Sequence, residues 1–456
     1  MNRLRVILKQ GKTNEVGLSL IEVLIAVVVF ALVATAIAFT VVAVLNVTKE
    51  SQNREEAANL ASQDIDLDRS ISNVFNLLDD TYQTTVQGTV FTVQRQVEWV
   101  TDSSVTAKCG TGGGNLEYKR VNVAVSWAGQ LGTTAPVHAD TLLNPATRIN
   151  NPTYGTILVS VEDESGDGMS GISVNATPAA TPNGATALTG TPAATDAEGC
   201  TYILSVVPGN YNVSISHAGY LDVNQNATPS TTVSVAASSA TSVSYQFDQA
   251  GTFTVSYPAS TSIPNNLDTS WVSTYGIYTT NAPVASQALY PFSSGYQVFA
   301  GDYDDPSLPS GGCPDVDPGS WVAGTSLDGT VVSAGARQAP VAASPGETGH
   351  PAPVTMGTFA ISTITSSQYV TAVQVNGDTA SGDPGCASSL LSTYTFVKGS
   401  LTNFALPYGT WQIWTGSTLG AKTTRVNISK LSITGGGHGG TESSNGGTLT
   451  IDPRMP

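Results

Sequence analysis

The stretch EVGLSLIEVLIAVVVFALVATAIAFTVVAVLNV, from Glu15 to Val47, decides how this chain is organised. It has no formal charge from Val23 to Val47, and about 20 apolar residues in a helix are enough to cross the core of a bilayer. The sequence therefore predicts a transmembrane helix. One carboxylate, Glu22, lies at the start of this run, where a charged side chain costs roughly 2.5 kcal/mol or more. An acid at this position indicates a function and needs a cationic partner.

The residues before the span indicate where that partner comes from. A polar leader ends at Gly17 and carries four basic residues that keep it cytoplasmic: Arg3, Arg5, Lys9 and Lys12. In a secretory signal peptide the small residue follows the apolar core, whereas here Gly17 precedes it. Cleavage between Gly17 and Leu18 would retain the span and create an α-amine about one helical turn from Glu22. This amine, on the same chain or on a neighbouring chain, is the candidate cation.

The basic leader and the segment from Gly17 to Ala26 together resemble the type IV prepilin family. The resemblance implies that a prepilin peptidase cleaves after Gly17 and that the new amine of Leu18 is N-methylated. It also implies that Glu22 aligns incoming pilin subunits, which reside in the inner (cytoplasmic) membrane before assembly. An ordinary signal anchor with an acid near the interface is the alternative interpretation.

Length and charge restrict the class of protein further. With 456 residues the chain is long enough for two to four domains, and it is longer than most pilins that it resembles, which favours a minor or tip subunit. Acidic residues number 34 against 18 Lys plus Arg, and no Lys or Arg lies between Arg148 and Arg337. Because nucleic-acid affinity depends on basic side chains that neutralise phosphates, a nucleic-acid partner is not expected.

The first predicted domain, residues 18–150, combines the helix with a small sheet. Neither Gly nor Pro occurs from Leu18 to Gln87, which permits one long helix, and its second part is amphipathic. The apolar positions of that part are Ala57, Leu60, Ala61, Ile65, Ile71, Val74, Phe75 and Leu78. We expect a membrane half and a half that docks on a sheet. A stalk or a coiled coil is the alternative, although the repeat is short for sustained heptads.

Two segments after Gly88 alternate apolar and polar residues, as half-buried antiparallel strands do: Thr89–Val100 and Tyr118–Gly129. They predict a strand pair similar to the globular part of small pilins. The following segment, Thr141–Gly155, is predicted to be a linker because Asn and Pro interrupt both periods.

Short strands separated by turn signals then predict a β-sandwich over residues 154–248. Its Asp/Gly hairpin, its Pro208-Gly209 turn and the later Gly219-Tyr220 pair resemble the carboxypeptidase regulatory or transthyretin-like sandwich. That resemblance implies a presentation or binding module without catalysis. Residues 251–456 continue as strands and predict one or two further all-β units, so the predicted fold class is α+β.

The four cysteines, Cys109, Cys200, Cys313 and Cys386, are an even number in a chain expected to reach an oxidising compartment. Four thiols allow three disulfide connectivities. Proximity in the chain favours Cys313 with Cys386 and Cys109 with Cys200. Four free buried thiols are the alternative, and the absence of any CxxC spacing argues against a zinc or iron-sulfur site.

One loop has a pattern that suits a metal ion. Asp163, Ser165 and Asp167 alternate before Gly168, as in the opening of a calcium loop, but the closing position is Val174 rather than Glu. The same residues suit a tight hairpin. A second acidic cluster surrounds Cys313 and is expected to consist of solvated loop acids, with calcium as the alternative: Asp302, Asp304, Asp305, Asp315 and Asp317. No other cofactor is predicted.

These observations favour a non-enzymatic minor pilin-like subunit of a bacterial type IV pilus that displays β-sandwich domains on the cell surface. The domains would serve adhesion or spacing, and the sequence does not identify their surface ligand. One alternative is a pseudopilin of a type II secretion system. An alternative of another class is a membrane-anchored extracellular enzyme or accessory module, for which the sequence offers no GxSxG elbow and only scattered histidines.

Overall fold

The computed structural model describes residues 19–102, 106–109, 114–129, 135–145, 149, 151–307, 312–326, 329–377, 379–398, 403–435, 440–441 and 447–455. The chain forms two compact units, one from Met1–Glu98 and Tyr118–Thr147 and the other from Trp99–Glu117 and Arg148–Pro456. The leader, with Gly17, and Leu18 lie outside the described residues. The predicted class is confirmed, because one long helix is followed by β-rich domains.

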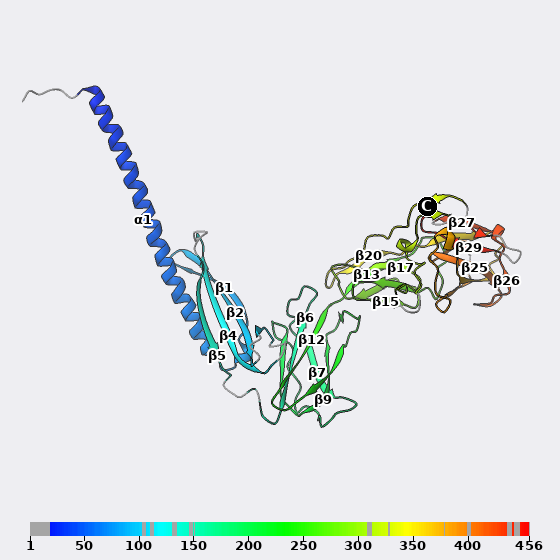
Figure 1. Ribbon diagram of the computed structural model, residues 1–456, viewed down its shortest axis with the longest axis horizontal. Coiled ribbons are helices and arrows are strands. Elements are labelled where there is room, and N and C mark those ends of the chain that lie inside the picture. Colours follow the sequence, from blue (N-terminus) through cyan, green and yellow to red (C-terminus); the bar gives the residue numbers. More distant parts are fainter. Residues whose placement is uncertain are drawn as a thin grey trace, which may run out of the picture. The chain divides into compact units, whose positions relative to one another are not determined.

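The first unit contains a 50-residue helix, α1 (Leu20–Arg69), along whose second half the sheet lies in Figure 1. Ser19 caps its N-terminus, and the absence of Gly and Pro lets it run without interruption. It is the one helix in the described part of the chain that is long and apolar enough to cross a membrane.

The helix ends earlier than the apolar pattern predicted. Ser70 is its C-cap, and Val74 to Asn76 form a short 3-10 turn, η1 (Val74–Asn76). Asn73 Oδ1 accepts a hydrogen bond from Phe75 N at 3.1 Å, so a short polar side chain competes for the backbone groups that a continuing helix would use. The expectation that Ile71, Val74, Phe75 and Leu78 extend the amphipathic helix was therefore wrong.

The sheet of this unit is larger than the predicted strand pair. Its order is β1-β2-β4-β5, and the β1–β2 and β4–β5 pairs are antiparallel. The short β3, which falls in the second unit, pairs antiparallel with Trp99 and Val100 at the end of β2. The bounds are β1 (Asp80–Val86), β2 (Thr89–Thr101), β3 (Thr106–Ala107), β4 (Leu116–Trp127) and β5 (Val137–Leu143). Gln87 and Gly88 have φ of 49° and 82°, the backbone that a two-residue hairpin turn requires. The prediction of a linker from Thr141 was wrong for its first residues, which belong to β5.

Alternating residues of β2 and β4 face α1 and form the core of this unit. The buried side chains are Ala57, Ala61, Ile65, Leu77, Phe91, Val93, Val97, Val121, Val123, Val125 and Trp127. Ala57 and Ala61 are fully buried in this core. Their side chains are small, which allows the helix to lie close to the sheet. The second half of α1 is thus held by sheet contacts that the first half lacks.

The second unit begins with a seven-stranded sandwich. One sheet has the order β10-β12-β6-β8 and the other β11-β9-β7. The bounds are β6 (Gly155–Glu162), β7 (Ser173–Pro178), β8 (Cys200–Val206), β9 (Gly209–Ser216), β10 (Tyr220–Asp222), β11 (Ser230–Val235) and β12 (Ala240–Gln249). The inward residues of both sheets share one core, which includes Ile157, Val159, Tyr211, Val213 and Phe247.

Most of the remaining strands contribute to one large core, whose buried residues run from Phe253 to Ile451. A smaller separate cluster consists of Phe299, Tyr303 and Val316. They form sheets β16-β13-β20, β15-β14-β17, β18-β19, β24-β21-β27 and β23-β22-β25-β29-β28, with β26 paired to β25. The first bounds are β13 (Gly251–Ser256), β14 (Thr269–Val272), β15 (Ile277–Thr280), β16 (Ser286–Leu289), β17 (Gln297–Ala300), η2 (Pro318–Ser320), β18 (Gly324–Thr325) and β19 (Val331–Val332). The strands that follow are β20 (Thr348–Pro353), β21 (Gly357–Ile361), β22 (Tyr369–Val375), η3 (Thr379–Ser381), β23 (Thr393–Phe396) and β24 (Asn403–Leu406). The last are β25 (Gly409–Gly416), β26 (Thr424–Arg425), η4 (Ile428–Lys430), β27 (Leu431–Gly435), β28 (Gly440–Thr441) and β29 (Thr448–Ile451).

Candidate assembly site

Glu22 lies in the first turn of α1, next to the cap that begins the helix. Ser19 Oγ accepts a hydrogen bond from Glu22 N at 3.3 Å, and Ser19 O accepts from Glu22 N and Val23 N at 3.0 and 3.2 Å. The positive end of the helix dipole favours an acid at this position. Glu22 also lines a shallow apolar hollow of about 460 Å³ with Val23, Ala26, Val27 and Phe30. A carboxylate is therefore presented beside an apolar surface that other helices can contact.

Within the described residues, the apolar half of α1, from Leu20 to Val47, is exposed along its whole length. Its large side chains are exposed from Leu20 at 84% to Val47 at 69%, and none of the residues from Leu20 to Lys49 is buried. Exposed apolar surface of this length is stable only in lipid or against other apolar helices.

The docked half of α1 carries a buried cluster of charged groups that the sequence analysis did not identify. Arg95 Nη1 of β2 lies 3.3 Å from Asp64 Oδ1 and 2.9 Å from Asp68 Oδ1, and its Nη2 lies 3.5 Å from Asp80 Oδ2. Tyr82 OH donates to Asp64 Oδ1 at 3.2 Å. Asp64 and Asp68 are four residues apart on α1, so the helical spacing of two acids was the available signal.

Within the described part of the chain, two buried carboxylate oxygens of this cluster are not hydrogen-bonded. Asp64 Oδ2 and Asp68 Oδ2 are buried and have no hydrogen-bond partner in the described residues. Burial raises the pKa of Asp68 to about 6, against the opposing attraction of Arg95, and the neighbouring Asp64 raises it further. The docking of α1 onto its sheet is therefore sensitive to the charge of Asp68.

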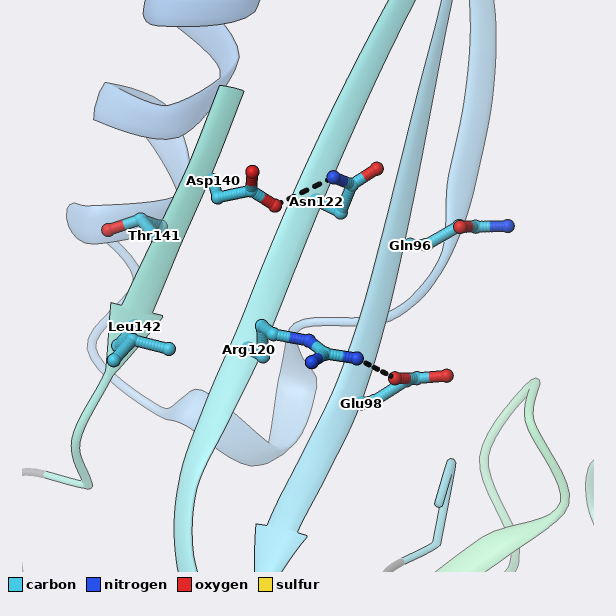
Figure 2. Close-up of a pocket in the computed structure, with 7 residues that line it drawn as sticks. All are labelled: Gln96, Glu98, Arg120, Asn122, Asp140, Thr141 and Leu142. Carbon is cyan, nitrogen blue, oxygen red and sulfur yellow. Dashed lines mark hydrogen bonds and ion pairs between the residues drawn. The ribbon is translucent and has the colours of Figure 1, made fainter. Parts of the chain in front are cut away.

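A polar hollow of about 580 Å³ lies on the same unit and is shown in Figure 2. Its lining residues come from β2, β4 and β5: Gln96, Glu98, Arg120, Asn122, Asp140, Thr141 and Leu142. Arg120 Nη2 donates to Glu98 Oε2 at 2.8 Å, and Asn122 Nδ2 donates to Asp140 Oδ1 at 2.6 Å. Since Arg120 pairs with Glu98 and Asn122 pairs with Asp140, these polar groups are not arranged to act on a substrate in this open hollow.

The cysteines form two disulfides, Cys109–Cys200 and Cys313–Cys386, with Cα–Cα distances of 5.3 and 4.0 Å. This is the connectivity that chain proximity favours. The first bond attaches the segment after β3 to β8 of the sandwich, and the second joins two loops of the C-terminal region. Both bonds close long loops, of 91 and 73 residues, and such closures restrict the unfolded chain.

The predicted calcium loop forms a hairpin turn after β6. Asp163 Oδ1 accepts hydrogen bonds from Ser165 N at 2.8 Å and from Asp167 N at 2.9 Å. One of the expected ligand oxygens is thus used to hold the backbone, which is the role that a tight turn gives to Asp. Calcium at Asp163, Ser165 and Asp167 stays a prediction.

The acids around Cys313 are not all solvated loop residues, which corrects the default expectation for this cluster. Asp315 and Asp317 are buried, with exposed fractions of 2% and 0%. Arg337 Nη2 pairs with Asp317 Oδ2 at 2.6 Å, and Gln374 Nε2 donates to Asp315 Oδ2 at 2.7 Å. Burial, assisted by the nearby Asp383, raises the pKa of Asp315 to about 7.

One group of metal-ligand types converges in the described residues: Cys313, Asp315 and Cys386. Because the two cysteines are joined in a disulfide, they offer no thiolate to a metal. This group is therefore a structural crosslink beside a buried carboxyl.

No family model and no curated protein matches the chain. Several solved structures align weakly, among them these three. The TIE protein of Bacillus anthracis has a TM-score of 0.18 and 11% identity, over 82% of this chain and 71% of that one. A streptococcal ancillary pilin has a TM-score of 0.18 and 12% identity, over 46% and 80%. The major pilin subunit of Bacillus cereus has a TM-score of 0.16 and 10% identity, over 65% and 95%. TM-scores this low establish no common fold, so function has to be inferred from the chain's own residues.

Proposed function

We propose that this chain is a non-enzymatic minor pilin-like subunit of a bacterial type IV pilus, anchored in the membrane before assembly and displaying β-sandwich domains outside the cell. One observation carries the proposal. The first half of α1 exposes apolar side chains on every side with Glu22 at its start, whereas the second half is docked on the sheet of the same unit. A helix built in this way can leave lipid and pack against equivalent helices in a filament core.

The assembly step follows from the position of Glu22. Cleavage by a prepilin peptidase after Gly17 would place the amine of Leu18, methylated or not, about one turn from this carboxylate. A carboxylate in an apolar environment is stabilised by an ammonium group within hydrogen-bond distance. The amine of one subunit and Glu22 of its neighbour would therefore set the register of helix packing.

The exposed domains supply the adhesive or spacer role. The two-sheet architecture of β6 to β12 is compatible with the resemblance to the carboxypeptidase regulatory-like sandwich. The two disulfides suit an oxidising extracellular location. The low content of basic side chains in this part of the chain disfavours nucleic acid as the ligand.

Glu22→Ala tests the proposal. We expect normal membrane insertion and cleavage but loss of the subunit from sheared filaments, measured by immunogold labelling and by immunoblotting of filament and cell fractions. Thr40→Ala is the matched control, because Thr40 is an exposed residue of the same helix whose Oγ1 donates to Ala36 O at 2.9 Å. Filaments that contain Glu22→Ala at the wild-type level would exclude this assembly role.

A further inference from the structure

A cleft of about 100 Å³ lies where the connection after β10 meets the β14–β15 hairpin, within the second unit. Four aromatic side chains and two amide side chains line it: Trp271, Tyr275, Tyr278, Tyr296, Asn224 and Gln225. Aromatic walls with a few polar groups are typical of sites for small ligands.

The floor of the cleft is fixed by hydrogen bonds to Gln225. Gln225 Nε2 donates to Tyr296 OH at 3.1 Å, and Gln225 Oε1 accepts from Tyr290 N at 2.7 Å. Tyr296 OH donates in turn to Tyr290 O at 2.7 Å. Burial raises the pKa of Tyr296, so its phenol stays protonated and keeps this donor. The floor is therefore preorganised before any ligand arrives.

The backbone of Gln225 is in an uncommon conformation. Its φ is 65°, in the left-handed region that costs a residue other than glycine on the order of 1 kcal/mol. The turn is held by Gln225 N, which donates to Asp222 O at 2.9 Å, and by Asp222 Oδ1, which accepts from Asn224 N at 2.9 Å. Strained residues that their surroundings hold in this way are concentrated at ligand sites.

One wall is an exposed aromatic ring held in a fixed position. Tyr275 is 57% exposed, yet its ring stacks on Phe292 with centroids 5.3 Å apart and an interplanar angle of 14°. Its hydroxyl donates to Gln246 Oε1 at 2.7 Å. An exposed ring with both its face and its hydroxyl fixed provides a rigid surface for the apolar face of a ligand.

Some polar groups at the cleft are left unpaired. Within the described residues, the side chain of Asn224 and the hydroxyl of Tyr278 have no hydrogen-bond partner, and Asn224 is exposed. Trp271 Nε1 is buried and also unpartnered. Unpaired donors and acceptors at a preorganised cleft favour a ligand with both kinds of group.

The charges near the cleft exclude anionic ligands. The adjoining sandwich contributes three acids: Asp222 at the end of β10, Asp248 in β12 and Glu164 in the turn after β6. No Lys or Arg occurs between Arg148 and Arg337. An anion would meet acidic side chains without a compensating cation. The volume of the cleft is also below that of sites for larger organic ligands.

We propose that this cleft binds the acetamido group of an uncharged N-acetylated sugar at the surface of another cell or matrix. The methyl group would contact the aromatic walls, while the amide would pair with Asn224. The inference gives the adhesive role proposed above its ligand class and rests on that role for its biological meaning. Sugar binding itself requires no filament.

Saturation-transfer NMR on the full chain in detergent tests this site, with N-acetylglucosamine, glucose and N-acetylneuraminic acid as probes. We expect the strongest transfer to the acetamido methyl of N-acetylglucosamine and little to the other two sugars. Tyr275→Ala and Asn224→Ala should each weaken binding about tenfold or more. Tyr275→Phe, which keeps the ring, should change it less than about threefold.

Tyr154→Ala is the matched control, because Tyr154 is a partly exposed tyrosine of the same unit that does not line this cleft. No transfer to the wild-type chain, equal transfer to glucose, or unchanged binding by Tyr275→Ala would each overturn the assignment. None of these results depends on incorporation into filaments. The sugar-binding proposal and the assembly role of Glu22 can therefore be confirmed or rejected separately.

Discussion

The two halves of α1 belong to one uninterrupted helix but obey different physical rules. From Leu20 to Val47 most side chains are apolar and all are exposed, and the single acid lies at the helix start. Near the other end, Asp64 and Asp68 are buried against Arg95 of the sheet. One continuous helix therefore includes both an exposed apolar surface and a surface that packs on the sheet. The first half needs partners outside the chain, whereas the second half has them within it.

The largest expected effect concerns the ion cluster of the docked half. Arg95→Met leaves two buried carboxylates without their cation, and breaking such a cluster costs about 3 kcal/mol or more. We expect the free energy of unfolding to fall by this amount in chemical denaturation of the full chain in detergent, with membrane insertion unchanged.

Arg120→Met is the matched control for that substitution. The side chains of Arg120 and Glu98 are 49% and 41% exposed, so their pair contributes less than about 1 kcal/mol. Equal losses for the two arginine variants would contradict the distinction between the buried cluster and the surface pair.

A smaller effect compares packing in the two halves. Ala57 is fully buried against the sheet, and Ala57→Leu should destabilise the first unit by about 1–3 kcal/mol through overpacking. Ala36→Leu, at an exposed position of the apolar half, should leave the unfolding transition of the monomer in detergent unchanged. Thermal unfolding followed by circular dichroism measures both, and similar shifts would mean that the first half is also packed within the chain.

The smallest effect is a pH dependence of docking. The pKa of Asp68 is raised by burial from its ordinary value of 3.8 to about 6, so ionisation is disfavoured in the folded state. Stability from this group is therefore lost as pH rises through about 6, and the first unit should be more stable at pH 5 than at pH 7.5, by on the order of 1 kcal/mol. In Asp68→Asn this contribution to the pH dependence of the free energy of unfolding should disappear. If the pH dependence of the variant equals that of the wild type, another group is responsible for it.

Strong periodic patterns allowed much of the fold to be predicted. The apolar run, and the alternation in β2 and β4, specify their elements locally, because period and burial agree. The sequence of β1 did not predict its strand, because Asp80–Val86 is mostly polar and lies at a sheet edge with little burial. The end of β5, from Thr141 to Leu143, was predicted to be a linker, because its pairing with β4 is a tertiary contact.

The residues of the candidate sites also differ in whether the sequence alone identifies them. Glu22 could be identified because an acid in an apolar run is costly wherever the chain folds. Arg95 and Gln225 could not, because their partners are distant in sequence: Asp64 is 31 residues from Arg95, and Tyr296 is 71 residues from Gln225. The burial of Asp315 and Asp317 likewise depends on loops that meet only in the folded chain.

The central claim is that Glu22 meets an amine created by cleavage after Gly17, and mass spectrometry of the N-terminal peptide of the protein purified from cells tests it most directly. The account predicts a peptide that begins at Leu18 and carries an added methyl group on its amine. A peptide that retains Met1, or one that begins beyond Val47, would contradict it.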